Sequence, residues 1–113
     1  MNSVLLSIKT LLGIPDNYDH FDNQIIMHIN DVLVKLHDIG VISGDPVRIS
    51  SDTDVWTQVI GDRSDLSDVI TYVYLNVRVA FDPPQNGSLM ESINRQIAEK
   101  EWRIHTRVEK GEL

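Results

Sequence analysis

A chain of 113 residues is long enough for one domain that buries roughly two thirds of its unfolded surface, and its apolar (42%) and charged (24%) fractions suit a globular protein. No apolar run approaches the roughly 20 residues needed to cross a bilayer, and no basic segment of a signal peptide opens the sequence, so we expect a soluble intracellular protein without a membrane partner. The absence of cysteine excludes disulfides, thiol catalysis and thiolate metal sites.

The net charge of −7 lies entirely in residues 1–87, where twelve Asp face five Lys or Arg, whereas residues 88–113 carry five charges of each sign. Tight nucleic-acid binding depends on a basic surface that neutralises phosphates. The acidic body therefore argues against such binding. It can still lie near DNA without adhering to it, because like charges repel.

Two amphipathic helices are predicted in the first 40 residues. The first covers residues 3–12, with Asn2 or Ser3 as its N-cap and Gly13 at its end. The second follows an acidic turn, in which Asp19 is expected to accept from the free N–H groups at the helix start. Its buried face is expected to hold Phe21, Ile25, Ile29, Val32, Leu33 and Leu36, and its exposed face Asn23, Asn30, Asp31, Lys35 and Asp38.

Gly40 is predicted to end this second helix, with Val41 folding back toward Leu36 in a Schellman motif. Residues 41–50 contain turn residues and a short extended stretch. A short helix is then expected from Thr53 to Ile60, capped by Ser51 or Asp52, with Trp56 in the core.

Residues 66–81 are the most apolar part of the chain and fit two patterns. Apolar residues alternate with polar ones as in a β-strand, yet Leu66, Val69, Val73 and Val77 also recur at helical spacing. A strand of about 16 residues is rare, so the length favours a buried helix. The strand remains the alternative.

The following segment predicts a break and then a long helix. Asp82, Pro83 and Pro84 cannot continue a helix, and with Gly87 they form a candidate hinge. Ser88 is expected to start the next helix in a capping box with Glu91. This helix has a thin apolar stripe and two favourable i,i+4 charge pairs, Glu91–Arg95 and Glu99–Arg103.

We therefore predict an all-α protein, a small bundle of about five helices with a long C-terminal helix after the Pro-Pro break. Residues 1–87 form the helical core and residues 88–113 an interaction helix within the same single domain. The sparse apolar stripe of the C-terminal helix predicts an arm directed outward from the core.

Catalytic and metal-binding patterns are weak. The four histidines have no ligand spacing, and Asp16, Asp19, Asp22, Asp52 and Asp54 are explained by helix capping. Asp62, Asp65 and Asp68 could hold Mg²⁺, but acidic residues are favoured at a helix start in any case. No phosphate-binding loop or nucleophile elbow is present. We expect no enzyme, no cofactor and no metal.

Trp102 is the candidate anchor of an interaction surface. It lies off the apolar stripe of its helix, and Trp and Arg together are enriched at protein–protein hot spots. Trp102 packed on its own domain is the alternative. The candidate interface comprises Arg95, Glu99, Trp102, Arg103, His105 and Arg107.

The chain resembles the phage head–tail connector proteins, also called adaptor or head-completion proteins, over most of its length. The most specific similarity is Phe81-Asp82-Pro83-Pro84 followed by Glu101-Trp102-Arg103-Ile104, and Val41–Ile60 matches least. The other matching segments are Leu11-Leu12-Gly13-Ile14, Phe21-Asp22-Asn23-Gln24-Ile25-Ile26 through Leu36 to Gly40-Val41, Val69-Ile70-Thr71-Tyr72-Val73, and Ile93-Asn94-Arg95-Gln96-Ile97.

The resemblance implies a virion structural protein that assembles in the host cytoplasm into a twelvefold ring at the head–tail junction. Its C-terminal helix would dock on the portal protein, its other end would receive a stopper or tail-completion protein, and DNA would pass nearby without specific binding. Two alternatives remain. One is a small helical adaptor or nucleic-acid-associated regulator acting through residues 95–107, and the other is a metal-dependent enzyme at Asp62–Asp68.

Overall fold

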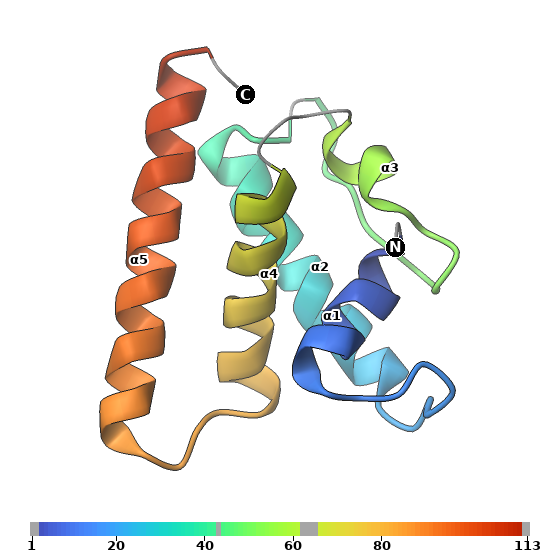
Figure 1. Cartoon of the computed structure of the whole chain (residues 1–113). Helices are drawn as coiled ribbons and strands as arrows, with labels where there is room; N and C mark the ends of the chain where they lie inside the picture. The colour runs from blue at the N-terminus through green and yellow to red at the C-terminus, as the bar shows by residue number, and fades with distance from the viewer. Residues whose placement is uncertain (1–2, 43, 62–65, 112–113) are drawn as a thin grey trace.

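The computed structural model describes residues 3–42, 44–61 and 66–111, and this part of the chain is all-α, as predicted (Figure 1). Five helices form a small bundle with no strand among the described residues, where a lone antiparallel bridge joins Ser3 and Val55. The molecule is flat, with principal extents of 38 × 35 × 21 Å.

The helices are α1 (Val4–Leu12), α2 (Asp22–Ile39), α3 (Trp56–Ile60), α4 (Leu66–Phe81) and α5 (Gly87–Glu109). The central helix α4 packs against α1, α2 and α5. Figure 1 shows α2 crossing behind α4 and α5 forming one edge of the molecule. The helical interpretation of residues 66–81 is confirmed, and the strand alternative is wrong.

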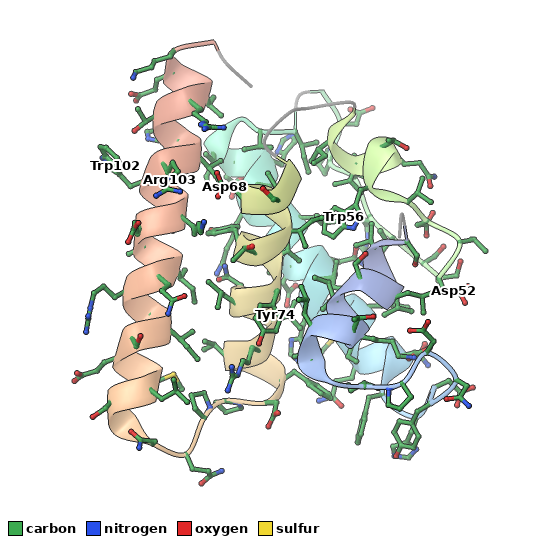
Figure 2. All side chains as sticks on the ribbon, viewed as in Figure 1. Asp52, Trp56, Asp68, Tyr74, Trp102 and Arg103 are labelled. Atoms are coloured by element: carbon green, nitrogen blue, oxygen red, sulfur yellow. The ribbon has the colours of Figure 1, made fainter. Side chains whose placement is uncertain are left out.

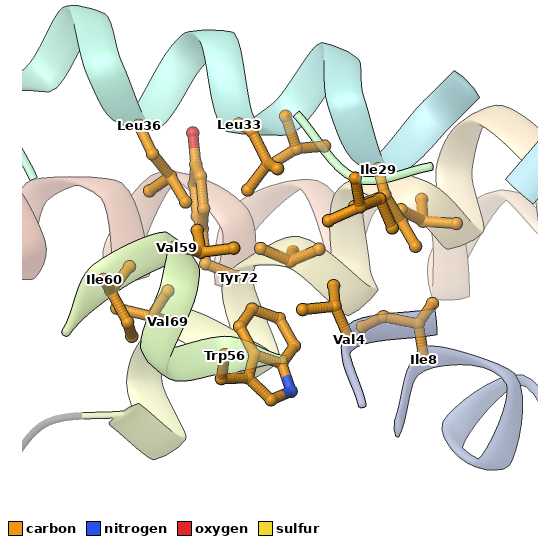
Figure 3. Packing of buried hydrophobic residues seen from close by; sticks show 14 of the residues in the cluster. Val4, Ile8, Ile29, Leu33, Leu36, Trp56, Val59, Ile60, Val69 and Tyr72 are labelled. Carbon is orange, nitrogen blue, oxygen red and sulfur yellow. The ribbon is translucent and has the colours of Figure 1, made fainter. Parts of the chain in front are cut away.

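One hydrophobic core joins all five helices. Tyr72 and Val73 of α4 are fully buried, and Trp56 of α3 packs in the same cluster, as predicted (Figure 3). Burial is also complete at Ile104 of α5. Other members of the core are Val4, Leu5, Ile8, Ile25, Ile29, Val32, Leu33, Leu36, Val41, Val59, Ile60, Val69 and Val77.

The predicted ends of α1 and α2 are confirmed. The Ser3 hydroxyl accepts from the Leu6 N–H, and Gly13 ends α1 in the left-handed conformation. Gly40 ends α2 with φ of +102°, and the Val41 N–H donates to the Leu36 carbonyl at 2.9 Å, so Val41 folds back and is buried. A Cβ atom on Gly40 would lie 3.1 Å from Cγ1 of Val108, so this turn packs directly against α5.

Three predicted helix starts are wrong. The N-cap of α2 is Phe21, without a side-chain cap, and Asp19 contributes only its backbone carbonyl to the Asp22 N–H. The Asn86 side chain, and not Ser88 with Glu91, caps α5 by accepting from the N–H groups of Ser88 and Leu89.

The third error concerns α3, which is shorter than predicted because Ser51 and Asp52 do not cap it. Asp54 instead accepts from the backbone of Ser50 and Ser51 and holds an irregular turn. The Gln58 side chain accepts from the Val55 N–H at 2.7 Å, so the helix begins at Trp56. The hydrogen bonds from the backbone of Ser50 and Ser51 hold the pKa of the Asp54 carboxyl below its usual value.

Two buried polar side chains tie the loops to the helices. The Lys9 ammonium, fully buried in α1, donates to the carbonyls of Asp16 and Tyr18 and pairs with Asp22 at 2.9 Å. Asn30 was expected on the exposed face of α2, and this is wrong. Its amide exchanges two hydrogen bonds with the Ile49 backbone, at 2.8 and 3.0 Å.

The prediction of an outward arm is also wrong. α5 lies along α4, where Ile93 and Ile104 are buried and Ile97 and Val108 are partly buried against the core (Figure 1). Few apolar residues suffice to pack α5 against the core, because they recur on one side of the helix. This apolar stripe covers α4, while the other side of α5 stays polar.

Candidate interaction surface on helix α5

The outer side of α5 carries three of the predicted interface residues in one row. Arg95, Glu99 and Trp102 are spaced by four and three residues, which places them on one face of a helix. Figure 2 shows Trp102 projecting from α5 away from α4. Its side chain is 69% exposed, so the alternative that it packs on its own domain is wrong.

Arg103 and Lys100 turn the other way, toward α4. The Lys100 ammonium lies 2.7 Å from Oδ1 of Asp68, and Arg103 lies 3.7 Å from the same oxygen and 3.2 Å from Glu99. The hydrogen bond from Lys100 holds the pKa of Asp68 below its usual value. Arg103 thus helps to bind α5 to α4 and is not simply part of a free surface.

The last two candidates lie further along α5. His105 is exposed and 3.6 Å from Glu109, an ion pair that requires a protonated imidazole. Arg107 is half-buried, and its charge also helps to lower the pKa of Asp68. The six candidates therefore divide between an outward row (Arg95, Glu99, Trp102), a side that holds α4 (Arg103, Arg107) and the exposed His105.

A shallow groove runs beside Trp102. The end of α2 contributes Asp38 and Ile39, and α5 contributes Ala98, Glu101 and His105. Glu101 of this groove is exposed and lies near the buried Tyr72 phenol. An exposed indole at the rim of a partly apolar groove is a suitable anchor for a protein partner, because such side chains bury a large area at low entropic cost.

The hinge candidates lie in the connection between α4 and α5. The Asp82 N–H donates to the Arg78 carbonyl at 2.8 Å and extends the last turn of α4. Pro83 and Gly87 are exposed, and Pro84 is partly buried. A hinge movement at these residues stays a prediction.

The metal-site alternative receives little support. Asp62 and Asp65 lie outside the described residues, and Asp68 is already engaged by Lys100. Within residues 3–42, 44–61 and 66–111, no group of three or more His, Asp or Glu side chains could hold a metal ion. In the same residues, no helix is long and apolar enough to cross a membrane.

A second surface, on α2, was missed from the sequence. Met27 and Val34 are 54% and 51% exposed and line a groove between α2 and the loop that contains Pro46 and Arg48. The sequence did contain an indication of this surface, because Met27 and Val34 are seven residues apart and lie off the buried stripe of α2. Isolated exposed apolar residues are common, and the neighbouring loop that makes them a groove could not be placed from sequence.

The comparison with protein families agrees with this architecture. The family model described as phage connector protein matches residues 4–111, nearly the whole chain, and the chain belongs to this family. It is thus a phage head–tail connector, a class of structural proteins of the virion that associate with other virion components. No curated protein and no solved structure matches the chain.

Proposed function

We propose that this connector forms a ring at the head–tail junction beneath the portal protein, twelvefold in the virion, through which DNA passes during packaging and ejection. The ring assembles from subunits in the host cytoplasm and contacts the portal on one side and a stopper or tail-completion protein on the other. The observation that carries the proposal is the outward row on α5, with Trp102 exposed on a helix that the core holds firmly in place.

The charge distribution supports a passage for DNA rather than a binding site. The net charge is −7, and the cations nearest Trp102 on α5 are engaged, since Lys100 and Arg103 pair with Asp68 and Glu99. A channel wall that bound phosphate would slow DNA movement, whereas an acidic one repels it weakly. The same pairing weakens the alternative of a nucleic-acid regulator acting through residues 95–107.

The proposal is tested by light scattering and electron microscopy of the purified protein, alone and with the portal protein of the same phage. We expect rings at high concentration or in the presence of portal. Trp102→Ala should weaken assembly by about 2 kcal/mol or more while the monomer melts almost as before, because the side chain contributes little to the core.

The matched control is Leu89→Ala, which truncates another exposed apolar residue of α5 near its other end. It should leave assembly unchanged. A strictly monomeric protein that also fails to bind the portal would contradict the proposal. Salt-dependent retention of DNA in a gel, lost with Arg103→Ala and Arg107→Ala, would favour the regulator instead.

A further inference from the structure

A closed ring of identical subunits needs two different surfaces on each copy, because every subunit contacts its two neighbours through opposite sides of a head-to-tail interface. The inference below rests on the proposed ring. Among the exposed surfaces of the described part of the chain, one on α5 and one on α2 combine apolar side chains with charged ones.

The first surface is the α5 strip, formed by Glu91, Arg95, Ala98 and Trp102. These residues are exposed and follow one another at intervals of three or four along the outer edge of the molecule. Glu91 and Arg95 are four residues apart, yet no ion pair joins either of them to any described residue. An acidic group and a basic group are thus available beside the exposed indole.

The second surface is the α2 groove, which is lined by the exposed apolar side chains of Met27 and Val34. Asn23 and Asp31 line it from α2, and Arg48 lines it from the loop opposite. Asp31 and Arg48 are both exposed and have no ion pair within the described residues. The groove therefore combines apolar area with one available charge of each sign, one from α2 and one from the loop.

We propose that the α5 strip of one subunit docks in the α2 groove of the next copy in the ring. Trp102 covers Met27 and Val34, where a flexible thioether and an aromatic ring pack favourably. Each available charge on the strip then has an opposite charge to pair with, Arg95 with Asp31 and Glu91 with Arg48. The occupant is a second copy of this chain because its own strip supplies both matching charges and the apolar anchor.

The two surfaces belong to different parts of one molecule, as a ring requires. α5 forms one edge, and α2 crosses behind α4 toward the opposite side (Figure 1). The groove residues Met27, Asp31 and Val34 precede the last turn of α2, whereas Asp38 and Ile39, in that last turn, lie beside Trp102. One copy can therefore offer its strip and its groove at the same time.

Site-specific cross-linking tests this contact directly, because the chain has no cysteine. Ala98→Cys places a thiol on the strip, and Asn23→Cys places one in the groove. The two variants are mixed, with and without the portal protein, and treated with a short bismaleimide. We expect the mixed dimer to exceed either homodimer about tenfold, and Thr57→Cys, exposed on α3, to give only background with either partner.

Second substitutions then identify the contact. Trp102→Ala added to the strip variant, or Val34→Asp added to the groove variant, should each reduce the mixed product about tenfold. Asp31→Arg in the groove should reduce it similarly, and Arg95→Asp in the strip should restore it. Since all four side chains are exposed, circular dichroism should show folded proteins throughout.

Three results would overturn the inference. Mixed product no higher than the Thr57→Cys background, or homodimers of Ala98→Cys in excess, would show that the strip does not meet the groove. Loss of portal binding in Trp102→Ala without any strip–groove product would assign α5 to the portal, and the proposed function would stand. Absence of rings and of portal binding in the unmodified protein would contradict the proposed function itself.

Discussion

Lys9 connects α1 to the loop that follows it through a buried ammonium group. The group satisfies two carbonyls, of Asp16 and Tyr18, and the Asp22 carboxylate at the start of α2. Burying a cation is costly unless it is paired and hydrogen-bonded, and here both conditions hold. Removing it leaves these three acceptors without their shared donor.

We expect Lys9→Met to lower the free energy of unfolding by about 2–3 kcal/mol, a value below that of a fully buried pair because Asp22 is partly exposed. Denaturant titration measures it. Lys110→Met removes an exposed lysine after α5 and should change stability by less than about 0.5 kcal/mol. Equal effects of the two substitutions would contradict the role given to Lys9.

Tyr72 should report on the core through its ionisation. Burial, followed by the negative charge of Glu101, raises the pKa of its phenol to about 12 from the ordinary 10.0. Since the folded protein holds the proton more tightly than the unfolded chain, stability does not depend on this group below pH 10 and falls as the pH rises from 10 to about 12. Absorbance titration at alkaline pH should show a late tyrosinate component that Tyr72→Phe removes.

The burial of individual polar residues could not be predicted from the sequence. Asn30 follows Ile29 in α2 and was assigned to the exposed face, because its Ile49 partner lies in a loop without periodicity. The burial of Lys9 could not be predicted either, because its partners lie in the turn after α1 and at the start of α2. Both residues are buried by partners distant from the helix face that holds them, and helical spacing contains no information about such partners.

At the scale of the helices, the packing of α5 is the feature that differs most from expectation. Its apolar stripe is thin, but Ile104 is fully buried between α5 and the core. We expect Ile104→Ala to cost about 3–4 kcal/mol, the usual effect of emptying a buried aliphatic site. Thermal or denaturant unfolding measures it.

The control for this prediction is Leu89→Ala. Leu89 lies in the same stripe of α5 but is 43% exposed, so its truncation should cost less than about 1 kcal/mol. Similar small losses for both variants would show that α5 is not an integral part of the core.

The ion pair between α4 and α5 predicts a specific pH dependence. Hydrogen bonding from Lys100 holds the pKa of Asp68 below its ordinary 3.8, so the stabilisation is present above that value and is lost as the pH falls through the folded-state pKa. Asp68→Asn should cost about 1 kcal/mol at pH 7. The difference from the unmodified protein should stay constant down to about pH 4 and shrink below it.

The existence of the helices was predictable, but the caps at the starts of α2, α3 and α5 were not. α4 was predicted from Leu66 to Phe81 and has these bounds, and Gly13 and Gly40 end their helices as expected. A left-handed C-terminal residue is almost always glycine, so it is visible in sequence. Several Asp, Asn and Ser residues precede α2, α3 and α5, and only the local backbone path determines which of them reaches the free N–H groups.

At the scale of the whole molecule, α5 packs against the core that the other helices form. The stripe of α5 covers α4, and Val108 packs against Gly40 at the end of α2. A chain that ends at residue 87 should therefore expose part of its core and unfold without a cooperative transition in calorimetry. A chain that ends at residue 109 keeps α5 and should melt like the full protein.

The interaction surface stays a prediction, and the structure bears only on where its candidate residues lie. Trp102 was identified because it interrupts an otherwise charged helix, and the structure shows it exposed. Arg103 was placed in the same surface, although it turns toward Asp68. The sequence could not separate these two neighbours, since the direction of a side chain beside the buried stripe depends on how α5 is rotated against α4.

The close fit of Val108 against Gly40 has a consequence for the order of events on the ribosome. The N-terminal helices emerge first, but the end of α2 lacks its covering residue, and Ile104 is missing from the core, until residues 104–108 have left the exit tunnel. A nascent chain that has not reached this length therefore presents neither a complete helix α5 nor a stably packed core for α5 to cover. In the proposed ring, subunits would become competent to join one another only after synthesis has passed this point, which would prevent contacts between incomplete chains during translation.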